Sequence, residues 1–148
     1  MAEPALSLDD IKALPKVSLH DHLDGGLRPA TILEIADAEG VSLPIDDATG
    51  APIGDKSLLG EWFAEKSDSG SLVEYLKTFD VTTAVMQSEA GLHRIAKEFV
   101  EDLIDDGVVV GEIRWAPEQH LNGGLTLDGA VEAVQSGIDE AVGAARTS

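Results

Sequence analysis

The stretch KVSLHDHLDGG, residues 16–26, decides the fold of this chain. It opens as a short β-strand and ends in a pair of glycines that interrupts regular structure. Side chains alternate between the two faces of a strand, so Ser18, His20 and His22 are expected on one face, with Asp21 pointing away from the histidines. On this pattern both imidazoles can contact the same metal ion.

The position of the His-x-His pattern in the chain indicates a metal site. Such a pattern alone is often chance, or a pair of hydrogen-bonded core histidines. Here it ends an apolar strand and runs into the loop 23–26, and α/β folds place their active sites at the carboxyl ends of strands. The chain has no cysteine, so nitrogen and oxygen must hold any metal. We interpret His20 and His22 as half of a divalent-metal site, whereas His93 and His120 are expected to take no part.

Strands and helices alternate along the rest of the chain. Apolar residues three and four apart, preceded by Ser or Thr caps, predict the helices. The predicted elements are a helix over 7–14, a strand over 16–19, helices over 30–39, 57–66 and 71–79, a helix from 88 to 107, a strand over 108–116, and a helix from 126 onward. The segments 41–55 and 117–125 are expected to be loops.

The second strand shapes the prediction of fold class. Residues 108–116 are apolar over most of their length, so we expect this strand to be buried on both faces. Alternating strands and helices predict an α/β fold with parallel strands, in either a doubly wound sheet or a barrel. Two strands leave the edges of such a sheet unpaired. We therefore expect one domain over residues 1–148 whose sheet is incomplete.

Charge and composition exclude several classes of protein. The 28 acidic and 10 basic residues give a net charge of -18, which disfavours binding to nucleic acids and to anionic membranes. The hydrophobic content of 43% is that of a globular protein. No stretch approaches the ~20 apolar residues of a membrane span, and no secretory signal is visible. A cytoplasmic location is the expectation.

Three separate stretches resemble one family. They are LPKVSLHDHLDGGLRPATILEIA at 14–36, SLVEYLKTFD at 71–80 and GEIRWAP at 111–117. In this order they are similar to the first strand, a helix beside the purine pocket and the second strand of the adenosine deaminase family. The resemblance implies the N-terminal part of a (β/α)8 TIM barrel, with two parallel strands, intervening helices and an incomplete barrel.

The resemblance also implies roles for individual residues. His20 and His22 would be zinc ligands, with one zinc ion in each complete site, and His22 and Asp24 would contact the purine nucleoside, Asp24 through its ribose. Asp24 could instead stabilise the turn at 25–26. The general acid and the remaining zinc ligands are expected beyond Ser148, so no catalytic residue is expected within the chain, which alone should be inactive.

Other positions are interpreted structurally. Glu112 and Arg114 share a face of the second strand and are expected to form a paired contact, because burying either charge alone is costly. Val110 stands where the family commonly has tyrosine. Four residues at helical spacing either wall the purine site or belong to the core, and the core is the expectation for Leu72, Tyr75, Leu76 and Phe79.

Three hypotheses for function follow. The first is zinc-dependent hydrolytic deamination of adenosine or deoxyadenosine to inosine or deoxyinosine, as part of a longer enzyme. The second is another amidohydrolase-type deaminase, such as an adenine deaminase. The third is a non-catalytic half-barrel that completes its sheet with a complementary barrel fragment or a second copy.

Overall fold

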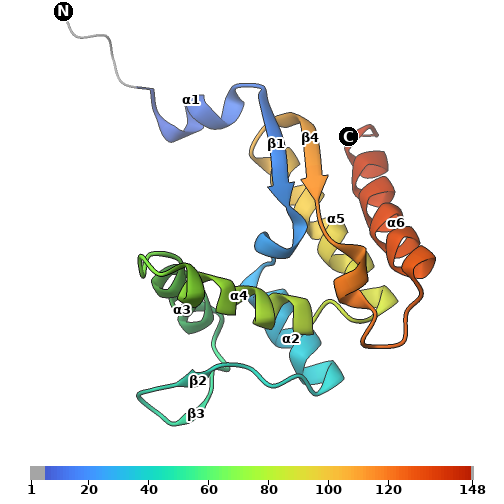
Figure 1. The fold of residues 1–148 in the computed structure, drawn as a ribbon. Coiled ribbons are helices and arrows are strands. Elements are labelled where there is room, and N and C mark those ends of the chain that lie inside the picture. Colours follow the sequence, from blue (N-terminus) through green and yellow to red (C-terminus); the bar gives the residue numbers. More distant parts are fainter. Residues whose placement is uncertain (1–5, 148) are drawn as a thin grey trace, which may run out of the picture.

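The computed structural model describes residues 6–147, which form an α/β fold (Figure 1). Two short 3₁₀ helices follow the two longer strands. In chain order the elements are α1 (Leu8–Ala13), β1 (Lys16–His22), η1 (Leu23–Gly25), α2 (Pro29–Glu39), β2 (Ile45–Asp46), β3 (Ala51–Pro52), α3 (Lys56–Ser67), α4 (Leu72–Ala84), α5 (Glu89–Asp105), β4 (Val108–Arg114), η2 (Pro117–His120) and α6 (Leu127–Ala145).

The sheet that positions the site consists of β1 and β4. The two strands pair in parallel, as predicted, and α5 and α6 lie beside them (Figure 1). The first strand is longer than the predicted 16–19 and runs through both histidines to His22. Each strand leads at its carboxyl end into a 3₁₀ helix, and α2, α3 and α4 gather beyond those ends. Residues from both strand ends can therefore meet in one region.

The prediction that the second strand is buried on both faces was wrong. Val109 and Val110 are 67% and 55% exposed, and Val17 and Leu19 on β1 are exposed as well. A strand is buried on both faces only when other elements cover both. Within residues 6–147 this sheet has two strands, so much of its apolar surface remains open to solvent.

The core lies at the carboxyl end of the sheet and is built mainly by helices. Leu23, directly after β1, is fully buried, and the predicted apolar stripe of α5 packs against it with residues of α2 and α6. The predicted cap residues Ser88 and Thr126 accept hydrogen bonds at the starts of α5 and α6. A Cβ at Gly26 would lie 2.5 Å from ring atoms of Phe99, so α5 supports the loop after the His motif at close range.

Some boundaries differ from the predictions. The segment expected to be a loop at 41–55 contains a small antiparallel pair, β2 and β3. Asp55 caps α3, accepting from two backbone N–H groups, where the sequence suggested a start at Ser57. The helix predicted to end at Phe79 continues to Ala84. No helix within the described residues is long and apolar enough to span a bilayer, and the cytoplasmic location stays a prediction.

Candidate metal and substrate site

The strand that carries the histidines is interrupted by a β-bulge. Ser18 pairs with Gly111 and Asp21 pairs with Ile113, so two residues of β1 lie opposite one residue of β4. One of the two is His20, whose φ of 57° lies in the left-handed region that residues with a Cβ rarely adopt.

The bulge changes which side chains share a face. The Ser18 hydroxyl donates to Asp21 Oδ2 over 2.7 Å. Simple alternation placed these two side chains on opposite faces of the strand, and that prediction was wrong. The extra residue in the bulge shifts the pleat by one position and brings them together.

The two histidine rings lie side by side at the end of β1. The centroids of the His20 and His22 rings are 5.3 Å apart, and the ring planes are inclined by 47°. Two imidazoles that bind one tetrahedral zinc ion at 2.0–2.1 Å have centroids about 5 Å apart, so the observed spacing suits a shared ion. Both side chains are exposed. Residues 6–147 hold no group of three or more His, Asp or Glu side chains placed to bind a metal.

Asp24 carries a free acceptor beside these rings. Its side chain is 15% exposed, and Oδ1 is buried without a hydrogen-bond partner. His22 Nδ1 lies 3.5 Å from Asp24 Oδ1, an ion-pair distance without hydrogen-bond geometry. Buried carboxylate oxygens are normally satisfied, so this atom is poised to accept from a further group. The turn at 25–26 is closed by the backbone, with the Gly26 N–H donating to the Leu23 carbonyl.

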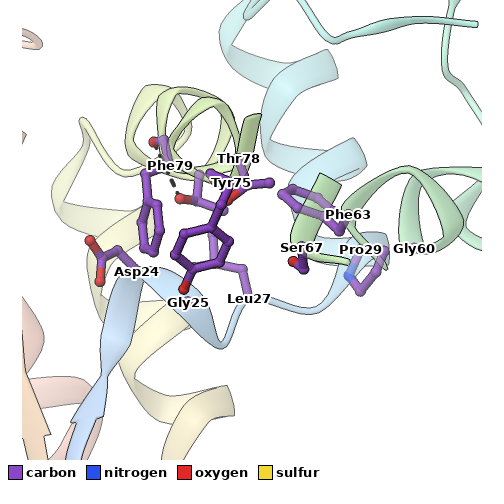
Figure 2. A pocket seen from close by; sticks show the side chains of 11 residues that line it. Asp24, Gly25, Leu27, Pro29, Gly60, Phe63, Ser67, Tyr75, Thr78 and Phe79 are labelled. Atoms are coloured by element: carbon purple, nitrogen blue, oxygen red, sulfur yellow. Dashed lines mark hydrogen bonds between the residues drawn. The ribbon is translucent and has the colours of Figure 1, made fainter. Parts of the chain in front are cut away.

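A cavity of ≈ 290 Å³ opens next to Asp24. Figure 2 shows Asp24 at one end beside Phe79, with Tyr75 in the middle and Phe63 further along. The rings of Tyr75 and Phe79 meet edge to face at 5.3 Å. The cavity thus combines one carboxylate with three aromatic rings, as a site for a planar ligand with hydroxyl groups would.

The helix α4 presents its residues to this cavity differently from the prediction. Leu72, Tyr75 and Leu76 are 70%, 40% and 52% exposed, so the expectation that the stripe belongs to the core was wrong for all three, and Phe79 is only partly buried. The buried face of α4 carries Thr78 and Thr82, whose hydroxyls bond to backbone carbonyls of the same helix. Intrahelical bonding allows threonine to be buried. Neither these threonines nor Phe63 was predicted from the sequence, because apolar spacing does not signal a buried polar face and does not show that Phe63 of α3 lines this cavity.

The profile of the family described as Adenosine deaminase matches residues 15–147. The chain belongs to the adenosine deaminase family. It is 54% identical over 135 residues to "Adenosine deaminase 1" of Streptomyces coelicolor, a match that covers 90% of this chain and 32% of that protein. It is 53% identical to an adenosine deaminase of Mycolicibacterium gilvum, covering 35% of that protein.

Solved structures of an amidohydrolase and of a deaminase share the fold. A Burkholderia ambifaria amidohydrolase with bound zinc matches 96% of the chain, with a TM-score of 0.69 and 25% identity. The Arabidopsis N6-mAMP deaminase matches 90%, with a TM-score of 0.66 and 29% identity. In each case the match covers 36% of the solved chain. This adenosine deaminase family chain therefore spans about a third of the length of the relatives it matches.

Three further residues singled out from the sequence, His93, Glu112 and Arg114, form ion pairs with other side chains. His93 Nε2 lies 2.9 Å from Glu140 Oε2, between α5 and α6. The predicted contact between Glu112 and Arg114 is confirmed by an ion pair of 2.5 Å, although both side chains are about half exposed.

His120 is a buried histidine close to the site. Its side chain is 1% exposed, and Nδ1 lies 3.1 Å from the Met86 carbonyl. Burial lowers the pKa of His120, and this effect outweighs the opposing influence of the Met86 carbonyl and of the negative charge on Asp24. The neutral imidazole packs against the ring of Trp115, with centroids 5.5 Å apart. This environment is that of a structural core histidine.

Proposed function

We propose that this chain supplies the first-strand part of a zinc-dependent adenosine deaminase site. In this proposal His20 and His22 bind the zinc ion, and His22 and Asp24 contact adenosine or deoxyadenosine. The observation that carries it is the buried Oδ1 of Asp24, which has no hydrogen-bond partner, beside two imidazoles whose spacing suits one ion. Relatives named as adenosine deaminases, and a related fold with bound zinc, support it.

Different residues of the chain would bind the metal and the substrate. A bound zinc ion would supply Lewis-acid chemistry and make water nucleophilic near neutral pH, for attack on the purine carbon that bears the amine. Asp24 would accept a hydrogen bond from a ribose hydroxyl, because an ionised carboxylate is an acceptor. The aromatic side chains of the cavity would cover the purine and exclude water.

The described residues supply only part of such a site. Two imidazoles are fewer ligands than a catalytic zinc site uses, and residues 6–147 offer no third group placed with them. We expect the remaining ligands and the general acid to come from further polypeptide, and the 148-residue chain alone to be inactive. The exposed valines of β1 and β4 supply an apolar surface that the same polypeptide could cover.

The position of Asp24 favours a nucleoside over a free base. Adenine has no hydroxyl groups, so a deaminase of free adenine would leave Asp24 Oδ1 without a donor from the sugar. An adenine deaminase from Arthrobacter aurescens shares the fold, with a TM-score of 0.62 and 26% identity, and gives the comparison substrate.

The test is complementation. The purified chain is refolded with zinc and a polypeptide carrying the part of the Streptomyces coelicolor relative that this chain does not match. Conversion of adenosine to inosine is followed by absorbance. We expect activity from the mixture and from neither polypeptide by itself. The activity should be lost in His20→Ala and His22→Ala, and the KM for adenosine should rise in Asp24→Ala. A folded, zinc-loaded mixture without activity, or full activity in His20→Ala, would contradict the proposal, and activity on adenine alone would support the second hypothesis.

A further inference from the structure

One side-chain hydrogen bond spans the bulge in β1. The Ser18 hydroxyl donates to Asp21 Oδ2 at 2.7 Å, and both side chains are partly buried. The two residues between them are Leu19 and His20, and His20 has the left-handed φ of 57°. Among residues 6–147 it is the one residue other than glycine with a positive φ. The bond therefore encloses the most unusual backbone position of the described chain.

We propose that Ser18 and Asp21 form a clamp that holds His20 in this conformation and so sets the spacing of the His20 and His22 rings. Both are positioning residues, since they act through the backbone of His20. The proposal rests on the proposed metal function of the histidine pair. It assigns a role to Asp21, the residue between the two histidines, which simple alternation left pointing away from the site.

The geometry of strands links the bond to the bulge. In a regular strand, residues three apart point to opposite faces and their Cα atoms are about 10 Å apart, so their side chains cannot meet. The Ser18–Asp21 bond can form only when the strand is bulged. Conversely, a left-handed conformation is costly for a residue with a Cβ and persists where surrounding contacts enforce it. The bond and the bulge therefore stabilise each other.

Loss of the clamp would affect the metal ligands directly. If the strand relaxed to regular pairing, the register after Ser18 would shift by one residue, and the side chains that follow would exchange faces. The ring spacing of 5.3 Å depends on the bulged arrangement. We therefore expect the chain to bind zinc more weakly without the clamp, even though neither clamp residue touches the metal.

The test is the zinc affinity of the 148-residue chain, measured by competition with a chromophoric chelator. Ser18→Ala and Asp21→Ala remove the bond, and we expect roughly tenfold weaker zinc binding, the size of one hydrogen bond to a charged group. Ser18→Thr and Asp21→Asn keep a hydroxyl donor and an oxygen acceptor, so we expect affinities within about threefold of the original. His20→Ala and His22→Ala define the site itself.

A second measurement determines the backbone conformation of His20 in the absence of metal. NMR chemical shifts and the HN–Hα coupling of His20 report its φ, and we expect them to move from left-handed towards extended values in Ser18→Ala and Asp21→Ala but not in Asp21→Asn. This readout separates the clamp from a general loss of folding, which would move signals throughout the spectrum.

Each outcome distinguishes the two proposals. If removing either histidine leaves the zinc affinity unchanged, the metal function itself is wrong. If the histidines matter but Ser18→Ala and Asp21→Ala bind zinc normally and keep the His20 backbone signals, the clamp is refuted. If Asp21→Asn weakens binding as much as Asp21→Ala does, the charge of Asp21 acts rather than its hydrogen bond, and the clamp is likewise refuted.

Discussion

Replacing His20 by glycine is expected to give a more stable chain than replacing it by alanine. Both substitutions remove the imidazole, so the two variants differ at the backbone. With φ at 57°, alanine carries the steric cost of its Cβ, which is about 1 kcal/mol in the left-handed region, whereas glycine adopts the conformation freely. For a chain of 148 residues this corresponds to roughly 3 °C in Tm.

The matched control is Val17, an exposed position of the same strand that pairs with Val110 and has no positive φ. There glycine should be less stable than alanine by about 0.5–1 kcal/mol, so the sign is opposite. Urea unfolding with a chelator present, followed by tryptophan fluorescence, gives the four free energies of unfolding. A His20→Gly variant that is less stable than His20→Ala, as at Val17, would refute the left-handed conformation and the bulge.

Three further predictions concern packing and pH. Gly137→Ala in α6 should lower the free energy of unfolding by roughly 1–3 kcal/mol, because its Cβ would lie 2.2 Å from a backbone carbonyl of α5. The control is Gly143→Ala in the same helix, whose Cβ would meet no atom within 4 Å. In the same urea assay this variant should be neutral or stabilising by up to about 1 kcal/mol. Gly26→Ala should also destabilise by about 1–3 kcal/mol, since its Cβ overlaps the ring of Phe99, and a normal urea midpoint would contradict that contact. Burial lowers the pKa of His120 in the folded chain, so as pH falls the imidazole is protonated in the unfolded chain before it is protonated in the folded chain. The free energy of unfolding should therefore fall as pH drops below about 6.5 towards the lowered pKa. His120→Gln should lose that part of the pH dependence.

The sequence predicted the long helices well because each carries its own signals. Ser88 and Thr126 cap α5 and α6 as expected, and most apolar positions of the two helices lie on the faces they bury, although Ile104 and Val131 are exposed. The parallel pairing of the two longer strands also followed from the alternation of elements. The burial of β4 could not be predicted from its own residues, because burial depends on which other elements cover the strand.

The motif pointed to His20, His22 and Asp24, and the structure brings them together at the end of β1. Their roles in binding metal and substrate stay predictions. The bulge was not predictable by alternation, because it combines a hydrogen bond between Ser18 and Asp21 with a rare backbone conformation at His20. The wall of the cavity depends on how α3 and α4 pack, which local periodicity does not encode.

The central claim is that one divalent metal binds to His20 and His22, and imidazole NMR tests it most directly. The four histidines of the 15N-labelled chain give four separate ring signals. On titration with Zn2+, we predict saturable changes at His20 and His22 together, at the same midpoint, while the rings of His93 and His120 stay unchanged. Changes centred on His93, which lies beside Glu140, or no saturable change at the His20 and His22 pair, would contradict the claim.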